Sequence, residues 1–250
     1  MKNRLHFHAP PILVLASLIS FHTAPAGRAQ TASPDAGNAI QQDNSGVPRI
    51  SFTNSTVLSR DPHSTVWQIV TVDNAGNTNV SSYTELATGL NFWNPATKQF
   101  EASKEILNLT KEGYATATNG QSSLILAPDI ASAGAVDLLN PDGIRLISNP
   151  MGLSYADSSS GKNVLIAQVT NSLGELASDN SVLYPQAFDS IRAAIRITYT
   201  RSGIEQDVIL YQQLPTPEQL GLDPASTKLQ MWTEVINQAT PQISATDSIR

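Results

Sequence analysis

Residues 194–211 read AIRITYTRSGIEQDVILY and contain the clearest strand pattern in the chain. From Ile195 to Tyr199, apolar residues alternate with polar ones. Successive side chains of a strand point to opposite faces, so the apolar ones would share one face. Arg201-Ser202-Gly203 is typical of a turn, and the residues after it again favour a strand. The pattern predicts an antiparallel hairpin with one buried face.

Apolar runs separated by turn residues recur over most of the chain. Asn119-Gly120 lies between two such runs, and this dipeptide accepts the positive φ angles of a tight hairpin. Pro141-Asp142-Gly143 separates another pair of runs. Helical periodicity is nearly absent, except for one turn expected from Pro217 to Gly221, with proline at its start and glycine at its stop. Short strands with turns every 8 to 12 residues or so predict an all-β fold, an antiparallel β-sandwich-like domain with at most one short helix.

Residues 1–29 have the organisation of a cleaved signal peptide. Lys2 and Arg4 precede an apolar stretch over residues 11–21, and small residues lead to a cleavage point after Ala29. The apolar stretch is shorter than the roughly 20 residues that a membrane-spanning helix needs, so we expect no membrane span after cleavage. The expected location is therefore outside the cytoplasm: secreted, periplasmic or on the cell surface.

The rest of the chain divides by composition. Residues 30–48 are small and polar and predict a flexible leader, and residues 241–250 have the same character and predict a flexible tail. Between them, residues 49–240 carry the strand pattern without a second linker. We therefore expect a single β domain over 49–240.

Composition excludes several classes of function. The chain has no cysteine, so its stability must come from a packed core rather than from disulfides, and an exported cysteine-free chain favours a bacterial source. Removal of the signal leaves 12 of the 15 basic residues against 21 acidic ones, a net charge of −9. Binding to nucleic acid depends on clustered Lys and Arg, so no nucleic-acid partner is expected.

The residues also argue against the common catalytic and metal sites. Three of the four histidines lie in the predicted signal, which leaves His63 alone. A serine nucleophile normally needs a histidine base held by a third group, and zinc sites need several His or Cys ligands. Residues 73–77 contain Asp and Asn but lack the acidic spacing of a calcium-binding loop. The sequence therefore predicts no catalytic, cofactor-binding or metal-binding residue and no cofactor.

Two weaker candidates remain. Glu205 and Asp207 are two apart on a predicted strand, hence about 6.6 Å apart on one face, within the roughly 5 to 9.5 Å that separates glycosidase carboxylates. Charge alternation on a solvent-facing strand explains the same pattern. Among the tryptophans, Trp67 lies in an apolar strand and is expected in the core. Trp93 flanks a turn and is the candidate ligand contact, as an exposed platform for a sugar.

One family resemblance covers much of the chain. Residues 182–188, VLYPQAF, followed by the hairpin over 194–210, resemble the non-repeat N-terminal β region of large secreted bacterial YD-repeat (Rhs-like) and wall-associated proteins. Residues 83–91 and 215–222 are also similar to such regions. The resemblance implies a secreted or surface-located module without catalytic residues of its own. No YD repeats follow in this sequence, so the repeat-shell function is not implied.

The sequence therefore predicts an exported, non-enzymatic β module with a structural or interaction role and an unknown extracellular or cell-surface partner. The alternative is a carbohydrate-binding or carbohydrate-active secreted domain with a glycan partner, and an unrecognised secreted hydrolase stays open.

Overall fold

The structure is a computed structural model that describes residues 13–18, 55–72 and 76–236. Strands make up nearly all of its regular structure, which confirms the all-β prediction. Contacts divide the chain into two compact units, with the boundary after Ser103. The sequence pattern offered no linker there, because the residues around Ser103 include no proline or glycine to mark a boundary.

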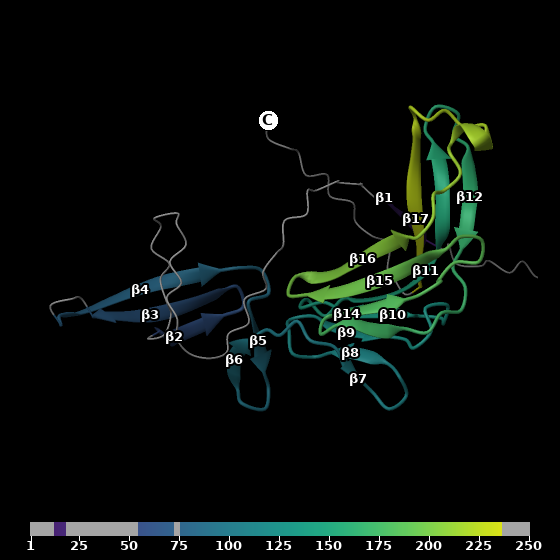
Figure 1. Ribbon diagram of the computed structural model, residues 1–250. Helices are drawn as coiled ribbons and strands as arrows, with labels where there is room; N and C mark the ends of the chain where they lie inside the picture. The colour runs from purple at the N-terminus through teal and green to yellow at the C-terminus, as the bar shows by residue number, and fades with distance from the viewer. Residues whose placement is uncertain (1–12, 19–54, 73–75, 237–250) are drawn as a thin grey trace, which may run out of the picture. The chain divides into compact units, whose positions relative to one another are not determined.

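The N-terminal unit consists of a three-stranded antiparallel sheet and a two-stranded hairpin (Figure 1). The sheet has the order β2-β3-β4, and the hairpin pairs β5 with β6. Their bounds are β2 (Ser55–Asp61), β3 (Ser64–Val72), β4 (Thr78–Leu86), β5 (Asn91–Asn94) and β6 (Gln99–Ala102). The strand expected over 65–72 is thus present, whereas most of the turn expected after it lies outside the described residues.

A buried asparagine ties the hairpin to the sheet in this unit. The Asn91 side-chain amide donates hydrogen bonds to the carbonyl oxygens of Asp61 and Ser64, both at 2.8 Å. Its carbonyl oxygen accepts one from Nη1 of Arg60 at 2.7 Å. Asn91 is fully buried, and a buried amide without partners would destabilise the fold. The side chain is therefore a structural link rather than a site.

The C-terminal unit contains two antiparallel sheets. In the larger one the order is β1-β17-β11-β10-β9-β8-β7, and β12 also pairs with β11. The bounds of these strands are β1 (Leu13–Leu18), β7 (Asn108–Leu109), β8 (Ala115–Ala117), β9 (Ser123–Leu126), β10 (Val136–Leu139), β11 (Arg145–Asp157), β12 (Asn163–Gln168) and β17 (Thr227–Val235). The smaller sheet has the order β13-β14-β15-β16. Its strands are β13 (Glu175–Ser178), β14 (Ser181–Tyr184), β15 (Ala193–Thr200) and β16 (Gly203–Leu210).

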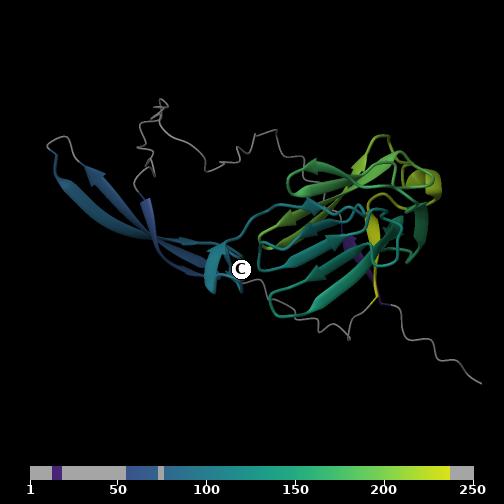
Figure 2. The same ribbon diagram turned by 90° about the horizontal axis from the view of Figure 1, so that it is seen from below.

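The two sheets face each other as a sandwich (Figure 2). One core cluster of buried side chains joins them, and it includes Leu124 and Leu126 from β9 and Ile195 and Ile197 from β15. The alternation seen in the sequence places these isoleucines on the inner face and Arg196 on the outer face. The hairpin predicted over 194–211 is confirmed, with β15 and β16 paired from Ala193 opposite Leu210 to Thr200 opposite Gly203.

Two buried tyrosines connect the sheets through hydrogen bonds. Tyr184 of β14 donates its hydroxyl to the carbonyl oxygen of Ala127, and Tyr199 of β15 donates to that of Ser122, both at 2.7 Å. The two carbonyls lie just after and just before β9 in the opposite sheet. The hydroxyls of the smaller sheet therefore satisfy backbone groups of the larger one.

The predicted turns lie where the sequence placed them, but at one of them glycine is required for a reason other than the predicted one. Gly143 has φ 79° between β10 and β11, as a turn glycine should, and Gly221 has φ 69° after the 3-10 helix η1 (Glu218–Leu220). Asn119-Gly120 connects β8 and β9, yet the φ angle of Gly120 is not positive. A Cβ at Gly120 would overlap the hydroxyl oxygen of Tyr199. Glycine is needed there for the close approach of a core tyrosine, not for a tight turn.

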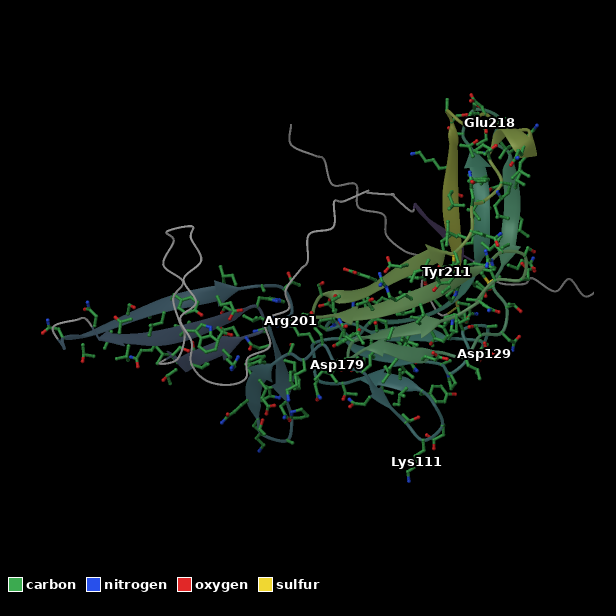
Figure 3. The ribbon with its side chains drawn as sticks, viewed as in Figure 1. Lys111, Asp129, Asp179, Arg201, Tyr211 and Glu218 are labelled. Atoms are coloured by element: carbon green, nitrogen blue, oxygen red, sulfur yellow. The ribbon has the colours of Figure 1, made fainter. Side chains whose placement is uncertain are left out.

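Three strands extend beyond the sandwich. The second half of β11 pairs with β17 on one edge and with β12 on the other. Together they rise away from the sandwich in Figure 1, and Glu218 of η1 lies at their far end in Figure 3. We call residues 152–168 and 227–232 the arm. At the other end of the unit, Asp179 and Arg201 lie in the two hairpin turns of the smaller sheet (Figure 3).

The first strand lies within the predicted signal peptide. Residues 13–18 pair antiparallel with β17, from Leu13 opposite Val235 to Leu18 opposite Gln230. The cleavage point at Ala29, the leader over 30–48 and the tail over 241–250 lie outside the described residues and stay predictions. Nowhere in the described part of the chain is there a helix with the length and hydrophobicity that crossing a membrane requires.

Candidate functional site

A cavity of about 650 Å³ lies where the arm leaves the sandwich. Its volume falls in the range of small-molecule sites, roughly 300 to 1,000 Å³. The lining comes from all three arm strands and from the loop after β9. The lining includes Ile130 from that loop, Pro150, Met151, Gly152 and Ser154 from β11, Asn163, Leu165 and Gln168 from β12, and Trp232 from β17.

An irregularity in β11 shapes this cavity. The pairing of β11 with β17 shifts register between Pro150 and Gly152, which leaves Met151 as an extra residue. Proline has no N–H to give to a sheet, and a bulge bends the strand that carries it. At Gly152, a Cβ would overlap the carbonyl oxygen of Ala167 on the neighbouring strand. Proline, an extra residue and a glycine therefore redirect β11 from the sandwich into the arm.

A chain of hydrogen bonds across the arm holds the cavity wall in place. Nε1 of Trp232 donates to Oγ of Ser154, and this hydroxyl donates to Oδ1 of Asn163 at 3.0 Å. The three residues lie on three adjacent strands. The indole is half-buried and its orientation is fixed by the hydrogen bond, so the ring forms a rigid side of the cavity.

The lining is apolar with neutral polar groups at its rim. Met151 is 47% exposed and Leu165 is 57% exposed, and both line the cavity. Asn163 and Gln168 supply side-chain amides at exposed positions. Among the described lining residues none carries a charge. Such a lining favours a neutral ligand with an apolar part over an ion or a phosphate.

Two carboxylates beside the cavity hold its backbone. Asp189 accepts a hydrogen bond from the N–H of Gln168 at 3.0 Å, and this bond is the main reason why the pKa of Asp189 is lowered. Asp129 accepts from the N–H groups of Ala131 and Ser172, both at 3.0 Å. Burial alone would raise the pKa of Asp129, but these hydrogen bonds outweigh it and lower the pKa. Both groups are therefore ionised at neutral pH, so neither is a proton donor.

Trp93, the ligand contact predicted from sequence, lies in the N-terminal unit. It belongs to β5, its side chain is 53% exposed, and Phe100 of β6 meets its ring edge to face, with the ring centroids 5.3 Å apart. Trp67 is half-buried rather than a core residue. Its ring stacks on Tyr83 at 6.3 Å, and its Nε1 donates to Glu85 at 3.1 Å.

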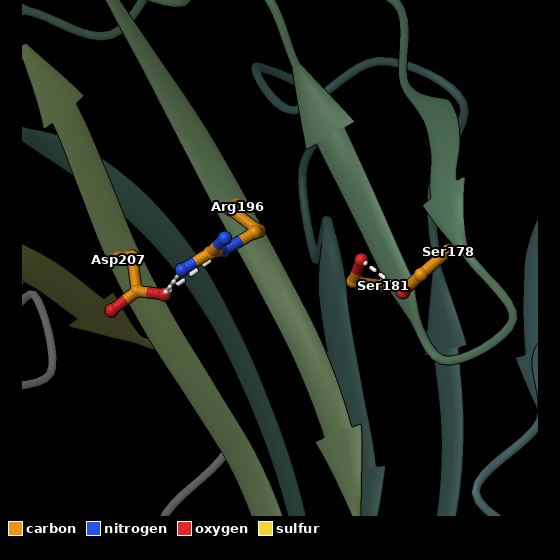
Figure 4. Close-up of polar contacts among 4 residues, drawn as sticks. All are labelled: Ser178, Ser181, Arg196 and Asp207. Carbon is orange, nitrogen blue, oxygen red and sulfur yellow. Dashed lines mark hydrogen bonds and ion pairs between the residues drawn. The ribbon is translucent and has the colours of Figure 1, made fainter. Parts of the chain in front are cut away.

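The candidate carboxylate pair is part of an ordinary sheet surface. Asp207 accepts hydrogen bonds from the guanidinium of Arg196 across β15 and β16, with the nearer nitrogen 2.7 Å away (Figure 4). Glu205 lies opposite Thr198 and is exposed. The two carboxylates share a face, as the spacing predicted, but one of them is held in an exposed ion pair, as charge alternation on a strand explains.

His63 lies in the turn between β2 and β3 and is exposed. Its Nδ1 accepts a hydrogen bond from the N–H of Gly89 at 3.2 Å, and the neighbouring Ser64 hydroxyl donates to Asp61 instead. The described residues contain no group of three or more His, Cys, Asp or Glu side chains that could hold a metal ion.

Sequence reasoning did not find the cavity. It did not single out Trp232, Ser154 or Asn163. One local signal was present, because a proline in the middle of an otherwise apolar strand pattern marks a bulge or a sheet edge. That signal is Pro150, which stands at the centre of the cavity-forming segment.

Comparisons with known proteins give no relative for this chain. No protein-family model, no curated protein and no solved structure matches it.

Proposed function

We propose that this chain is an exported, non-enzymatic interaction module that binds a neutral, partly apolar ligand in the cavity at the base of the arm. The observation that carries the proposal is the cavity lining: a fixed indole, apolar side chains and uncharged amides, built across three strands. Neither the acidic pair on β16 nor His63 lies in this lining. Binding rather than catalysis is therefore the role that the site supports.

The proposed location outside the cytoplasm rests on the signal pattern over residues 1–29. The resemblance to leading regions of YD-repeat and wall-associated proteins favours the same location. Expression of the full chain in a bacterial host, followed by N-terminal sequencing of the exported fraction, tests this part. A new N-terminus at Gln30 is the expected result, and retention of Met1 would contradict it.

A charge placed inside the cavity tests the binding role. Leu165 is 57% exposed, so Leu165→Glu should leave the fold intact while it introduces a carboxylate into the apolar lining. Leu109→Glu is the matched control, because Leu109 is 55% exposed on β7 and is not part of the lining. The probes are arrays of neutral peptides and neutral oligosaccharides, tested with the chain from Gln30 onward.

A ligand that binds the unmodified chain should bind Leu165→Glu at least about tenfold more weakly, since an unpaired charge in an apolar site is strongly unfavourable. The Leu109→Glu variant should bind as the unmodified chain does. Equal binding by both variants, or the absence of any bound ligand on the arrays, would contradict the proposed site.

Carbohydrate binding through the N-terminal unit is a second proposal, favoured by one specific observation. Trp93 exposes 53% of its side chain, and the edge contact with Phe100 fixes the ring, as a sugar platform requires. On the oligosaccharide array, Trp93→Ala should abolish this binding and Trp232→Ala should not. The reverse pattern would place sugar binding in the cavity instead.

A further inference from the structure

The outer edge of β17 is the strongest unassigned feature of the described chain. One edge of β17 pairs with β11 over residues 148–157, and the other pairs with β1 over residues 230–235. If the signal is cleaved after Ala29, β1 leaves with it. Among the described residues, no other strand then pairs with this edge of β17.

An unpaired strand edge is normally protected. Natural edge strands are kept short, or they carry prolines, lysines or bulges that prevent another strand from adding to them. β17 has nine residues and no proline, and its one lysine, Lys228, lies near its start. The bulge at Met151 lies in β11 and not in β17. Residues 229–233 are uncharged, and Glu234 near the end of the strand accepts a hydrogen bond from the Asn149 side chain on β11 at 3.3 Å. The edge is therefore built to accept a strand rather than to repel one.

We propose that the β17 edge of the mature chain binds an extended, uncharged apolar peptide segment of a partner, added antiparallel as a further strand. The structure itself contains an example of such an occupant. Residues 13–18, with the sequence LVLASL, pair with β17 over six consecutive positions in this orientation. The proposal rests on the proposed export, because cleavage frees the edge, and it names the ligand class for the cavity.

The cavity would add selectivity to this edge. Trp232 lines the cavity, and side chains of directly opposed residues in a sheet lie on the same face. A peptide residue opposite Trp232 would therefore project on the cavity face of the new strand. In the observed register that position is held by Ala16. Main-chain hydrogen bonds to β17 would supply affinity and the cavity would select the side chain, as in other cases of strand addition.

The experiment uses the chain from Gln30 onward and a synthetic peptide of residues 12–19 with a lysine added at each end for solubility. Binding is measured by fluorescence anisotropy of the labelled peptide. Two methylated versions provide the matched control: one is N-methylated at Leu13, Leu15 and Ser17, the other at Val14, Ala16 and Leu18. In an antiparallel pair, alternate residues turn their N–H groups towards the partner strand, so only one version loses these hydrogen bonds.

We expect the unmodified peptide to bind and one methylated version to bind at least about tenfold more weakly, while the other binds within about threefold of the unmodified peptide. An equal loss of affinity in both methylated peptides, or no loss in either of them, would overturn strand addition. Peptide binding that Leu165→Glu weakens but methylation does not would leave the cavity proposal standing and overturn this one.

A second copy of the chain is the other possible occupant of the edge, and sedimentation velocity detects it. Sedimentation velocity at rising protein concentration should show a monomer. A dimer that excess peptide does not dissociate would mean that a second copy of the chain closes the edge, and this would overturn the proposal. The N-terminal sequencing described above tests cleavage separately, so a failure of export and a failure of strand addition are distinguishable.

Discussion

Removal of the Tyr184 hydroxyl tests whether hydrogen bonds between the sheets stabilise the sandwich. In Tyr184→Phe the ring and its packing remain, and only the 2.7 Å hydrogen bond to the Ala127 carbonyl is lost. Tyr184 is fully buried. The loss of a buried hydrogen bond of this kind costs about 1 to 2 kcal/mol in the free energy of unfolding. For a domain of this size the corresponding drop in Tm is about 3 to 6 °C.

Tyr199→Phe should cost a similar amount, because its hydroxyl donates to Ser122 at the same distance. Ser122 and Ala127 flank β9 at its two ends, about 16 Å apart at the rise of a strand. Effects at such separation usually add, so the double variant should lose about 2 to 4 kcal/mol. Tyr114→Phe is the control, because the Tyr114 side chain is 42% exposed.

The assay is urea unfolding followed by tryptophan fluorescence. Trp67→Phe and Trp93→Phe are introduced into every variant, so that Trp232 alone reports on the C-terminal unit that contains both tyrosines. The slope of free energy against urea should stay constant, because the surface exposed on unfolding does not change. A loss below about 0.3 kcal/mol for Tyr184→Phe, or an equal loss for Tyr114→Phe, would refute the reasoning.

High pH provides a second measurement on the same residues. Burial raises the pKa of Tyr184, with a further contribution from Asp129, and burial also raises that of Tyr199. The unfolded chain ionises its tyrosines near pH 10, whereas these two stay protonated in the folded state. Their contribution to stability is therefore complete below about pH 10 and is lost as pH rises above it. The Tyr184→Phe variant should lose less stability than the unmodified chain between about pH 10 and 11.

Two further predictions concern the arm. The hydroxyls of Ser160 and Ser226 hold the pKa of Asp157 well below its usual range, so this carboxylate stabilises the fold above about pH 4 and the contribution fades as pH falls further. Asp157→Asn should therefore lower Tm at pH 7 and have a smaller effect at pH 2, as measured by circular dichroism melts. Gly152→Ala should destabilise the C-terminal unit by about 1 to 3 kcal/mol, because the new Cβ would overlap the Ala167 carbonyl oxygen, and urea unfolding measures this loss. An unchanged Tm of Asp157→Asn at pH 7, or an unchanged free energy of unfolding of Gly152→Ala, would contradict the corresponding contact.

The strands were predictable where one face is buried and turn residues punctuate the chain. Alternation from Ile195 to Tyr199 predicted both the hairpin and its inner face, because burial of one face imposes a period of two on the sequence. Gly143 identified a real turn. Gly120 shows where local reasoning fails, because the feature that requires glycine there is the hydroxyl of Tyr199, distant in sequence.

The cavity was not predictable because its parts meet only after folding. Ser154 and Trp232 are 78 positions apart, and neither has a local pattern that distinguishes it from an ordinary strand residue. The division into two units after Ser103 was not predictable either, because it follows from which residues contact each other in the folded chain and not from composition. The local sequence pattern predicts individual strands and turns, whereas a site built across several strands depends on the register in which those strands pair.

The bulge at Met151 links the features proposed for binding. It bends β11 out of the sandwich, and β17 follows β11 so that Trp232 faces Ser154 at the bend. Because the hydrogen-bonded chain from Trp232 through Ser154 to Asn163 crosses three strands, the cavity wall is ordered before any ligand arrives, and binding loses little side-chain freedom. In the proposed mature chain, an ordered wall beside the β17 edge would recognise a backbone and a side chain together. Under this proposal the uncharged lining would disfavour charged side chains of either sign, and the net negative charge expected after cleavage would disfavour acidic segments further, so extended, neutral, apolar sequences are the expected partners.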